Sequence, residues 1–433
     1  MTATSFLVPF AGLITAPILA RALGSAGRGE LAAALAPSAL MLAVATFGLP
    51  DAITYYLAKR PGSTRRAVLW GTAITVVLGF ICLGITWLAL PFLSVGDAAL
   101  AENILLATAV TIPALAVGVF RGAATGRQMW RFVAIERLIL TGLRVLCFVV
   151  LWAIGALTVF TAVLVSVILP IVGGVIYLVL LVKPRQDQDD PDVSDRVLFS
   201  ILSYGSKVWL GSIASMLISR IAPLIMAPLS SVYDLGLYTV ASTISDIALV
   251  VALAVQGALF GVNARTANAT QLTNTARLTT LAAIVGCAGI AATLPFWIEP
   301  LFGTEFRDAT IPTIILLASA IICVPGLMAS SGLSAWGRPG LRSVGLAITF
   351  VVNLGSLIIL VPLLGVYGAT ITSVISNILL TGTMVLFASR VMSVPASDFF
   401  VLRGSDFVRA WSELLNLAGA IRRRLRRPAP EAD

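Results

Sequence analysis

The chain alternates long apolar runs with short polar segments, and most of the apolar runs are long enough to cross a bilayer. A membrane-spanning helix needs about 20 largely apolar residues. The pattern therefore predicts an all-α polytopic membrane protein. We expect twelve transmembrane helices, at 5–23, 31–58, 67–95, 104–120, 132–154, 157–182, 202–229, 235–262, 278–302, 309–328, 341–361 and 366–391.

The basic residues between these spans predict the orientation of the chain. Cytoplasmic loops of membrane proteins carry an excess of Lys and Arg. The odd-numbered loops carry only Arg21, Arg28 and Arg307. The even-numbered loops carry Lys59, Arg60, Arg65, Arg66, Arg121, Arg127, Arg131, Lys183, Arg185, Arg196, Arg265, Arg277, Arg338 and Arg342. We therefore expect a multi-pass protein of the inner membrane with both termini in the cytoplasm. The first run shows no cleavage pattern after it and is expected to be retained.

The two halves of the sequence repeat each other. Ala16-Pro17 recurs as Ala222-Pro223, and the Ala-x-Gly-Arg-x-x-x-Arg pattern that begins at Ala124 recurs at Ala335. Each half ends on a matching stretch, 155–168 and 365–378. Because the offset covers an even number of spans, the repeats have the same topology, with a pseudo-two-fold axis along the membrane normal.

This repeat predicts the domain organisation. We expect an N-terminal six-helix bundle at 1–182 and a C-terminal six-helix bundle at 198–391, joined by a hydrophilic cytoplasmic linker at 183–197. The remaining segment, 392–433, has apolar residues at helical spacing and ends in an arginine cluster. It is typical of an amphipathic basic tail lying on the anionic cytoplasmic leaflet.

Composition narrows the classes of function. The chain is 58% hydrophobic and only 11% charged, so its main solvent is lipid. Histidine is absent, which excludes histidine proton relays, imidazole metal sites and Ser-His or Cys-His catalysis. Cys82, Cys147, Cys287 and Cys323 stand singly in apolar runs, as packing residues do. We expect no metal, no cofactor and no nucleic-acid partner, since the net charge of +9 is typical of cytoplasmic loops.

Three stretches of the chain carry a family resemblance: RALGSAGRGELAAAL at 21–35, PLFGTEFRDATIPTIILL at 300–317 and the segment 331–376. With the tandem halves, they resemble the multidrug/oligosaccharidyl-lipid/polysaccharide (MOP) flippase superfamily, in its polysaccharide and O-antigen repeat-unit branch. The resemblance implies two six-helix bundles in a V shape like that of the MATE drug exporters, around a central cavity. It also implies alternating-access transport of an undecaprenyl-diphosphate-linked oligosaccharide for cell-surface polysaccharide synthesis.

Charged residues inside the expected spans are the candidates for substrate contact. A charge at mid-bilayer costs roughly 2.5–3.5 kcal/mol, so such a side chain normally faces a cavity or a partner. Arginine binds a diphosphate through its forked donors. We expect Arg144 and Arg220, one in each half, to bind this group, with Lys207 and Arg137 as further substrate contacts.

The intramembrane carboxylates and two prolines complete the candidate set. Asp51, Asp246 and Glu136 are read either as ion-coupling groups or as members of structural ion pairs. Pro17 and Pro223 occupy matching positions in the two halves, where they act either as hinges or as static kinks.

Three functions remain open on the sequence. The first is the flippase, acting as a monomer, with other polysaccharide-assembly membrane proteins as candidate partners. The second is an ion-coupled antiporter of small molecules or drugs from the same superfamily. The third, a membrane-embedded glycosyltransferase or polymerase, is disfavoured because no long loop offers catalytic acids. The sequence also lacks a Gly-rich loop of the Walker type for ATP hydrolysis.

Overall fold

The computed structural model describes residues 2–59, 64–178, 194–266 and 268–401. These ranges are almost entirely helical and contain no strand. Most of each expected span is helical, but a turn at 46–48 divides the span expected at 31–58, and residues 179–182 of the span expected at 157–182 lie outside the described ranges. The helices of the N-terminal half are α1 (Thr2–Ala45), α2 (Leu49–Lys59), α3 (Thr64–Leu93), α4 (Ala98–Gly126), α5 (Trp130–Ala153), α6 (Val159–Gly174) and the 3₁₀ turn η2 (Val175–Leu178). Those of the C-terminal half are α8 (Ser194–Leu229), α9 (Val232–Thr266), α10 (Ala269–Phe302), η4 (Thr304–Ala309), α11 (Thr310–Ala335), α12 (Pro339–Leu364), α13 (Val366–Met392) and η5 (Ala396–Phe399).

Helix α1 consists of two limbs that join at Gly24. This glycine has φ 69° and ψ −175°. Glycine adopts such a positive φ at the lowest free-energy cost because it has no Cβ. Both limbs lie along α9: Ala16 of the first limb packs with Val240, and Ala39 of the second lines the same cavity as Asp246. The chain therefore folds back at Gly24. The second limb begins at Ser25, earlier than the expected span at 31–58, because its first turns are polar.

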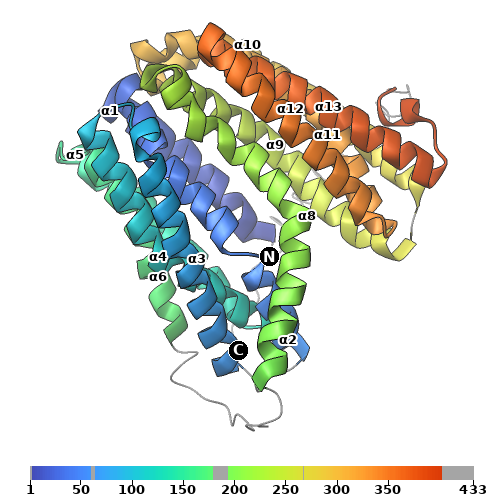
Figure 1. The fold of residues 1–433 in the computed structure, drawn as a ribbon. Coiled ribbons are helices and arrows are strands. Elements are labelled where there is room, and N and C mark those ends of the chain that lie inside the picture. Colours follow the sequence, from blue (N-terminus) through green and yellow to red (C-terminus); the bar gives the residue numbers. More distant parts are fainter. Residues whose placement is uncertain (1, 60–63, 179–193, 267, 402–433) are drawn as a thin grey trace, which may run out of the picture.

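The helices form two bundles that diverge from a common end. Figure 1 shows the N-terminal half (blue to green) and the C-terminal half (green to red) close together beside the α1 label and separated away from it. This arrangement confirms the V shape and the two-bundle architecture that the repeat and the resemblance predicted. Contacts within the C-terminal half are extensive between α11 and α13 and between α11 and α9.

Helix α8 belongs to the C-terminal half by sequence but packs on both halves. It contacts α12 on one side and α1, α2 and α3 on the other. Where it meets the N-terminal half, the rings of Phe47 and Trp209 lie 5.1 Å apart, and Gly48 packs directly against the backbone of Gly205. α8 therefore links the bundles at the end where the even-numbered loops lie.

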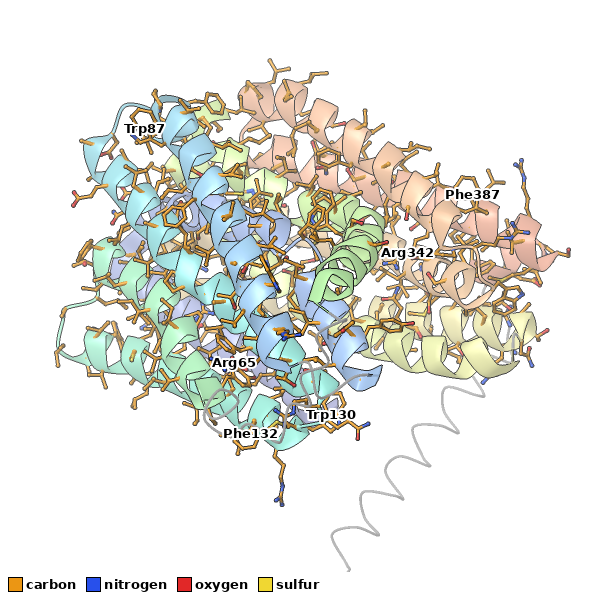
Figure 2. All side chains as sticks on the ribbon, turned by 60° about the horizontal axis from the view of Figure 1, so that its bottom comes forward. Arg65, Trp87, Trp130, Phe132, Arg342 and Phe387 are labelled. Carbon is orange, nitrogen blue, oxygen red and sulfur yellow. The ribbon has the colours of Figure 1, made fainter. Side chains whose placement is uncertain are left out.

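The outer surface fits a bilayer. Within the described ranges, eight helices are long and apolar enough to cross a membrane by length and composition. Large apolar side chains of α3 face outward, among them Phe80, Ile85 and Leu88. Figure 2 shows Trp87 and Arg65 toward opposite ends of α3, which fits aromatic and basic anchors at the two membrane interfaces. The chain is a multi-pass membrane protein.

Two expected segments lie wholly or partly outside the described residues. The amphipathic basic tail falls there from residue 402 onward, and the linker falls there over 183–193. The last part of the expected linker, 194–197, is helical because α8 begins at Ser194.

Candidate functional site

The central site is a cavity with two lobes between the bundles. The lobe of about 500 Å³ lies mainly among helices of the C-terminal half and is called the C-half lobe. The lobe of about 660 Å³ lies mainly among helices of the N-terminal half and is called the N-half lobe. Leu35, Ala39, Arg144 and Arg220 line both lobes. The two arginines therefore stand where the lobes meet.

Arg144 and Arg220 come from opposite halves of the repeat. Arg144 lies on α5 and Arg220 on α8, and both side chains are exposed to the cavity. The guanidinium carbon of Arg144 lies 5.8 Å from the centroid of the Phe148 ring, one turn further along α5. Neither arginine has a carboxylate within 4.0 Å in the described part of the chain. The two forked donors are therefore free to meet an anion.

Arg28 is a third arginine of this cavity, and the sequence placed it in an odd-numbered loop instead. That assignment was wrong, because the second limb of α1 begins at Ser25 and Arg28 lines the C-half lobe. Its Nε atom is buried and has no hydrogen-bond partner in the described structure. Arg28 lines this lobe together with Arg144. The sequence feature that indicates its position is a basic residue shortly after a glycine break. The stretch around it is too polar to be recognised as part of a span by hydropathy.

The two lobes carry one exposed carboxylate each. Asp51, after Pro50 on α2, lines the N-half lobe, and Asp246 on α9 lines the C-half lobe. The charge of Arg220 acts on Asp246, but no ion pair within 4.0 Å joins them. No group of three or more His, Cys, Asp or Glu side chains among the described residues is arranged to hold a metal ion.

Glu136 lies outside the cavity, inside the N-terminal half. Its side chain is completely buried and receives hydrogen bonds from Arg121 at 2.6 and 3.2 Å and from the Tyr177 hydroxyl at 3.4 Å. This forked pair joins α4 to α5, and the tyrosine adds η2. The structure therefore places Glu136 in an ion pair within the bundle, with Arg121 as its partner. The neighbouring Arg137 points away and lines the N-half lobe.

The remaining candidates are placed as follows. Lys207 lies on α8, but its side chain is outside the described residues. Pro223 lines the C-half lobe, whereas Pro17 lines a separate apolar pocket of about 140 Å³ between α1, α9 and α10. α8 runs unbroken through Pro223. The hinge roles of both prolines stay predictions.

The cavity is sealed at the end where the odd-numbered loops gather, called here the odd-loop end. Ser25 donates to Oε2 of Glu305 from its backbone N–H and from its hydroxyl, both at 2.8 Å. Arg21 donates to the carbonyl oxygens of Pro300 and of Leu301, the latter at 3.1 Å. Between these contacts, α1 and α9 touch backbone to backbone at Gly29 and Gly236. Residues of both halves therefore close this end.

Comparison with protein families identifies the family of the chain. A family model described as polysaccharide biosynthesis protein matches residues 1–267. The chain belongs to the polysaccharide biosynthesis protein family. No curated protein matches it.

Solved structures show which fold this polysaccharide biosynthesis protein has. It is similar to a multidrug resistance MATE family transporter of the MOP superfamily in its inward-facing conformation, at TM-score 0.70, with 18% identity over 90% of this chain and 98% of that one. It is also similar to the lipid II flippase MurJ in an inward closed conformation, at TM-score 0.71, with 11% identity over 96% and 92%. The fold is that of the MOP transporters.

The likeness also depends on conformation. The TM-score to an outward-facing MATE transporter of the same superfamily is 0.53, at 19% identity over 90% of this chain and 95% of that one. The higher score of the inward-facing structure agrees with the contacts that seal the odd-loop end. The protein therefore adopts a conformation in which the odd-loop end is closed.

Proposed function

We propose that this protein moves a polyprenyl-diphosphate-linked oligosaccharide from the cytoplasmic to the outer leaflet of the inner membrane, for cell-surface polysaccharide synthesis. In this proposal both termini are cytoplasmic, and the odd-loop end faces outward. The observation that carries it is the meeting of Arg144 and Arg220 between the two lobes. The family and the MOP fold support the same reading.

Charge in the cavity favours an anionic substrate. Three arginines, Arg28, Arg144 and Arg220, line the C-half lobe with one carboxylate, Asp246. Cations that repel each other in a membrane interior cost free energy unless an anion joins them. A diphosphate carries several oxygens that accept forked guanidinium donors. The arginine cluster therefore fits the anionic linkage between lipid and sugar.

Alternating access follows from the seal. Because the contacts at Ser25, Gly29 and Glu305 join the two halves, opening the odd-loop end requires the halves to separate there. Arg144 and Arg220 lie between the two lobes. They therefore stay beside the substrate while the cavity closes at one end and opens at the other. Asp51 and Asp246 are the proposed groups for ion coupling, one in each lobe.

A headgroup-accessibility assay in proteoliposomes tests the function. The probe is a polyprenyl-diphosphate glycan with a fluorophore on the sugar, quenched by a reagent that does not cross the bilayer. We expect flipping by the wild type and its loss in the Ala and the Lys variants of Arg144 and Arg220, since lysine lacks the forked donors. Arg307→Ala, an exposed arginine outside the cavity, is the control. Full flipping by both Ala variants contradicts the role of the arginines, and an inactive wild type contradicts the function.

The exposed carboxylates favour a second candidate, an ion-coupled antiporter of cationic small molecules. Asp51 and Asp246 are acceptors for such a cation, and multidrug transporters share the fold. In this case the wild type exports a cationic dye and ignores the glycan lipid, and Asp51→Asn or Asp246→Asn abolishes the export. The arginine-to-alanine variants keep it.

A further inference from the structure

The two lobes differ at positions that the repeat makes equivalent. In the matching stretches 155–168 and 365–378, Ser166 corresponds to Ser376 and Val167 to Asn377. Ser166 and Val167 line the N-half lobe, whereas Ser376 and Asn377 line the C-half lobe. The same wall therefore presents a methyl surface to one lobe and an amide to the other.

Neighbouring side chains hold this amide in place. Asn377 Nδ2 donates to the Ser319 hydroxyl at 2.8 Å, and its carbonyl oxygen receives no hydrogen bond in the described structure. A second pair lines the same lobe, where Asn353 Nδ2 donates to the Ser376 hydroxyl at 2.8 Å. Within the described residues, the serine hydroxyls of both pairs accept a hydrogen bond and donate none. The pairs thus retain hydrogen-bonding capacity.

The neutral groups of the N-half lobe offer less of this capacity. Its hydroxyls donate to carbonyls of their own helices, as Thr111 does to Ala107 at 2.7 Å and Ser166 to Ala162 at 2.8 Å. No asparagine or glutamine lines that lobe within the described residues. Its walls offer mainly satisfied hydroxyls, aliphatic groups and the charges of Asp51, Arg121 and Arg137.

A sugar ring fits the chemistry of the C-half lobe. Its hydroxyls both donate and accept, so they match an amide oxygen, serine protons and the carboxylate of Asp246 together. The volume of about 500 Å³ lies within the ~300–1,000 Å³ of small-molecule sites. The arginines stand at the border of this lobe, so an anionic group held there places an attached sugar beside Asn377.

We infer that the C-half lobe is the glycan subsite, in which Asn377 binds sugar hydroxyls. This inference rests on the proposed function and assigns the parts of its substrate. The arginine cluster binds the diphosphate, and the hydrogen-bonding wall of α13 selects lipids that carry a glycan. Asn377 is a residue at which the two lobes differ in an equivalent position of the repeat.

Binding to two lipids tests the assignment. The probes are a polyprenyl-diphosphate disaccharide and the same polyprenyl diphosphate without sugar, each titrated onto the purified full-length protein to obtain a Kd. Asn377→Val gives the C-half lobe the residue of the N-half lobe. We expect it to weaken binding of the disaccharide lipid about tenfold, as for one or two lost hydrogen bonds, and to leave the bare lipid within about twofold.

Matched variants make the result decisive. Val167→Ala changes the equivalent wall of the N-half lobe and is expected to leave both Kd values within about twofold. Asn377→Ala and a melting curve of each variant separate a binding effect from misfolding. Equal weakening of both lipids by Asn377→Val, or no effect on either, overturns the assignment. Failure of the wild type to bind either lipid overturns the proposed function instead.

Discussion

Gly29 and Gly236 meet where the two halves of the protein close the odd-loop end. Gly29 lies on the second limb of α1 and Gly236 on α9. Gly29 packs against the backbone carbonyl of Val232, four positions before Gly236, and Gly236 packs against that of Ser25, four positions before Gly29. A Cβ at either position would overlap that oxygen. Small residues permit such backbone approach between membrane helices. The contact is reciprocal between the two halves.

Enlarging either glycine is expected to open this end. Gly29→Val and Gly236→Val cannot keep the backbone contact, so the state with the odd-loop end closed loses population at least about tenfold, since one severe overlap costs more than 1.4 kcal/mol. Spin labels at Val95 and Thr304, in a variant without the native cysteines, report the distance across this end. Gly286→Val, whose Cβ would meet open space, is the control. An unchanged distance distribution in both variants would falsify the role of the contact.

The hydrogen bonds of Glu305 are expected to stabilise the same state. Glu305→Ala removes the acceptor for both donors of Ser25, and because Glu305 is exposed we expect a modest loss of about 1 kcal/mol, or about fivefold in the closed population. The same label pair measures it. Glu299→Ala removes only an exposed pair with Arg307 at 3.7 Å and is expected to change little. If the two variants behave alike, the Ser25 contact contributes nothing to the seal.

Removing one partner of the buried pair in the N-terminal half is expected to destabilise the protein. Glu136→Ala leaves Arg121 without its forked acceptor, at a cost of about 3 kcal/mol. A melting curve in detergent measures the loss, and Arg121→Met with Glu136→Leu is expected to restore most of it. If the loss of stability in the double variant equals the sum of the losses in the two single variants, the two residues are not coupled.

Arg28 is expected to lower the stability of the protein without substrate and to strengthen the binding of the polyprenyl diphosphate. Arg28→Met removes a cation whose Nε has no partner, so the melting temperature of the protein alone is expected to stay equal or rise. Binding of the polyprenyl diphosphate is expected to weaken about tenfold, as for a lost charge-assisted hydrogen bond. Arg307→Met is the control for loss of a positive charge. A large fall in melting temperature, with unchanged binding, would assign Arg28 to the fold instead.

Local features of the sequence were sufficient for the helices and for two of the arginines. Hydropathy depends on residues a few turns apart, so it located the helices, although it did not show the turn at 46–48 that divides the span expected at 31–58. Arg144 and Arg220 lie deep in apolar runs, and because lipid penalises a bare charge, a cavity was the expected environment; both line it. The repeat likewise predicted two bundles, since helices with matching sequences and the same direction pack alike.

The tertiary structure alone decided which groups meet. Hydropathy placed Arg28 outside the membrane because a cavity-lining turn is as polar as a loop, and only the fold at Gly24 brings it to the other arginines. The partner of Glu136 is Arg121, fifteen positions earlier on another helix. Local patterns report whether a side chain avoids lipid. They do not report which helix faces it, since that depends on how all the helices pack at once.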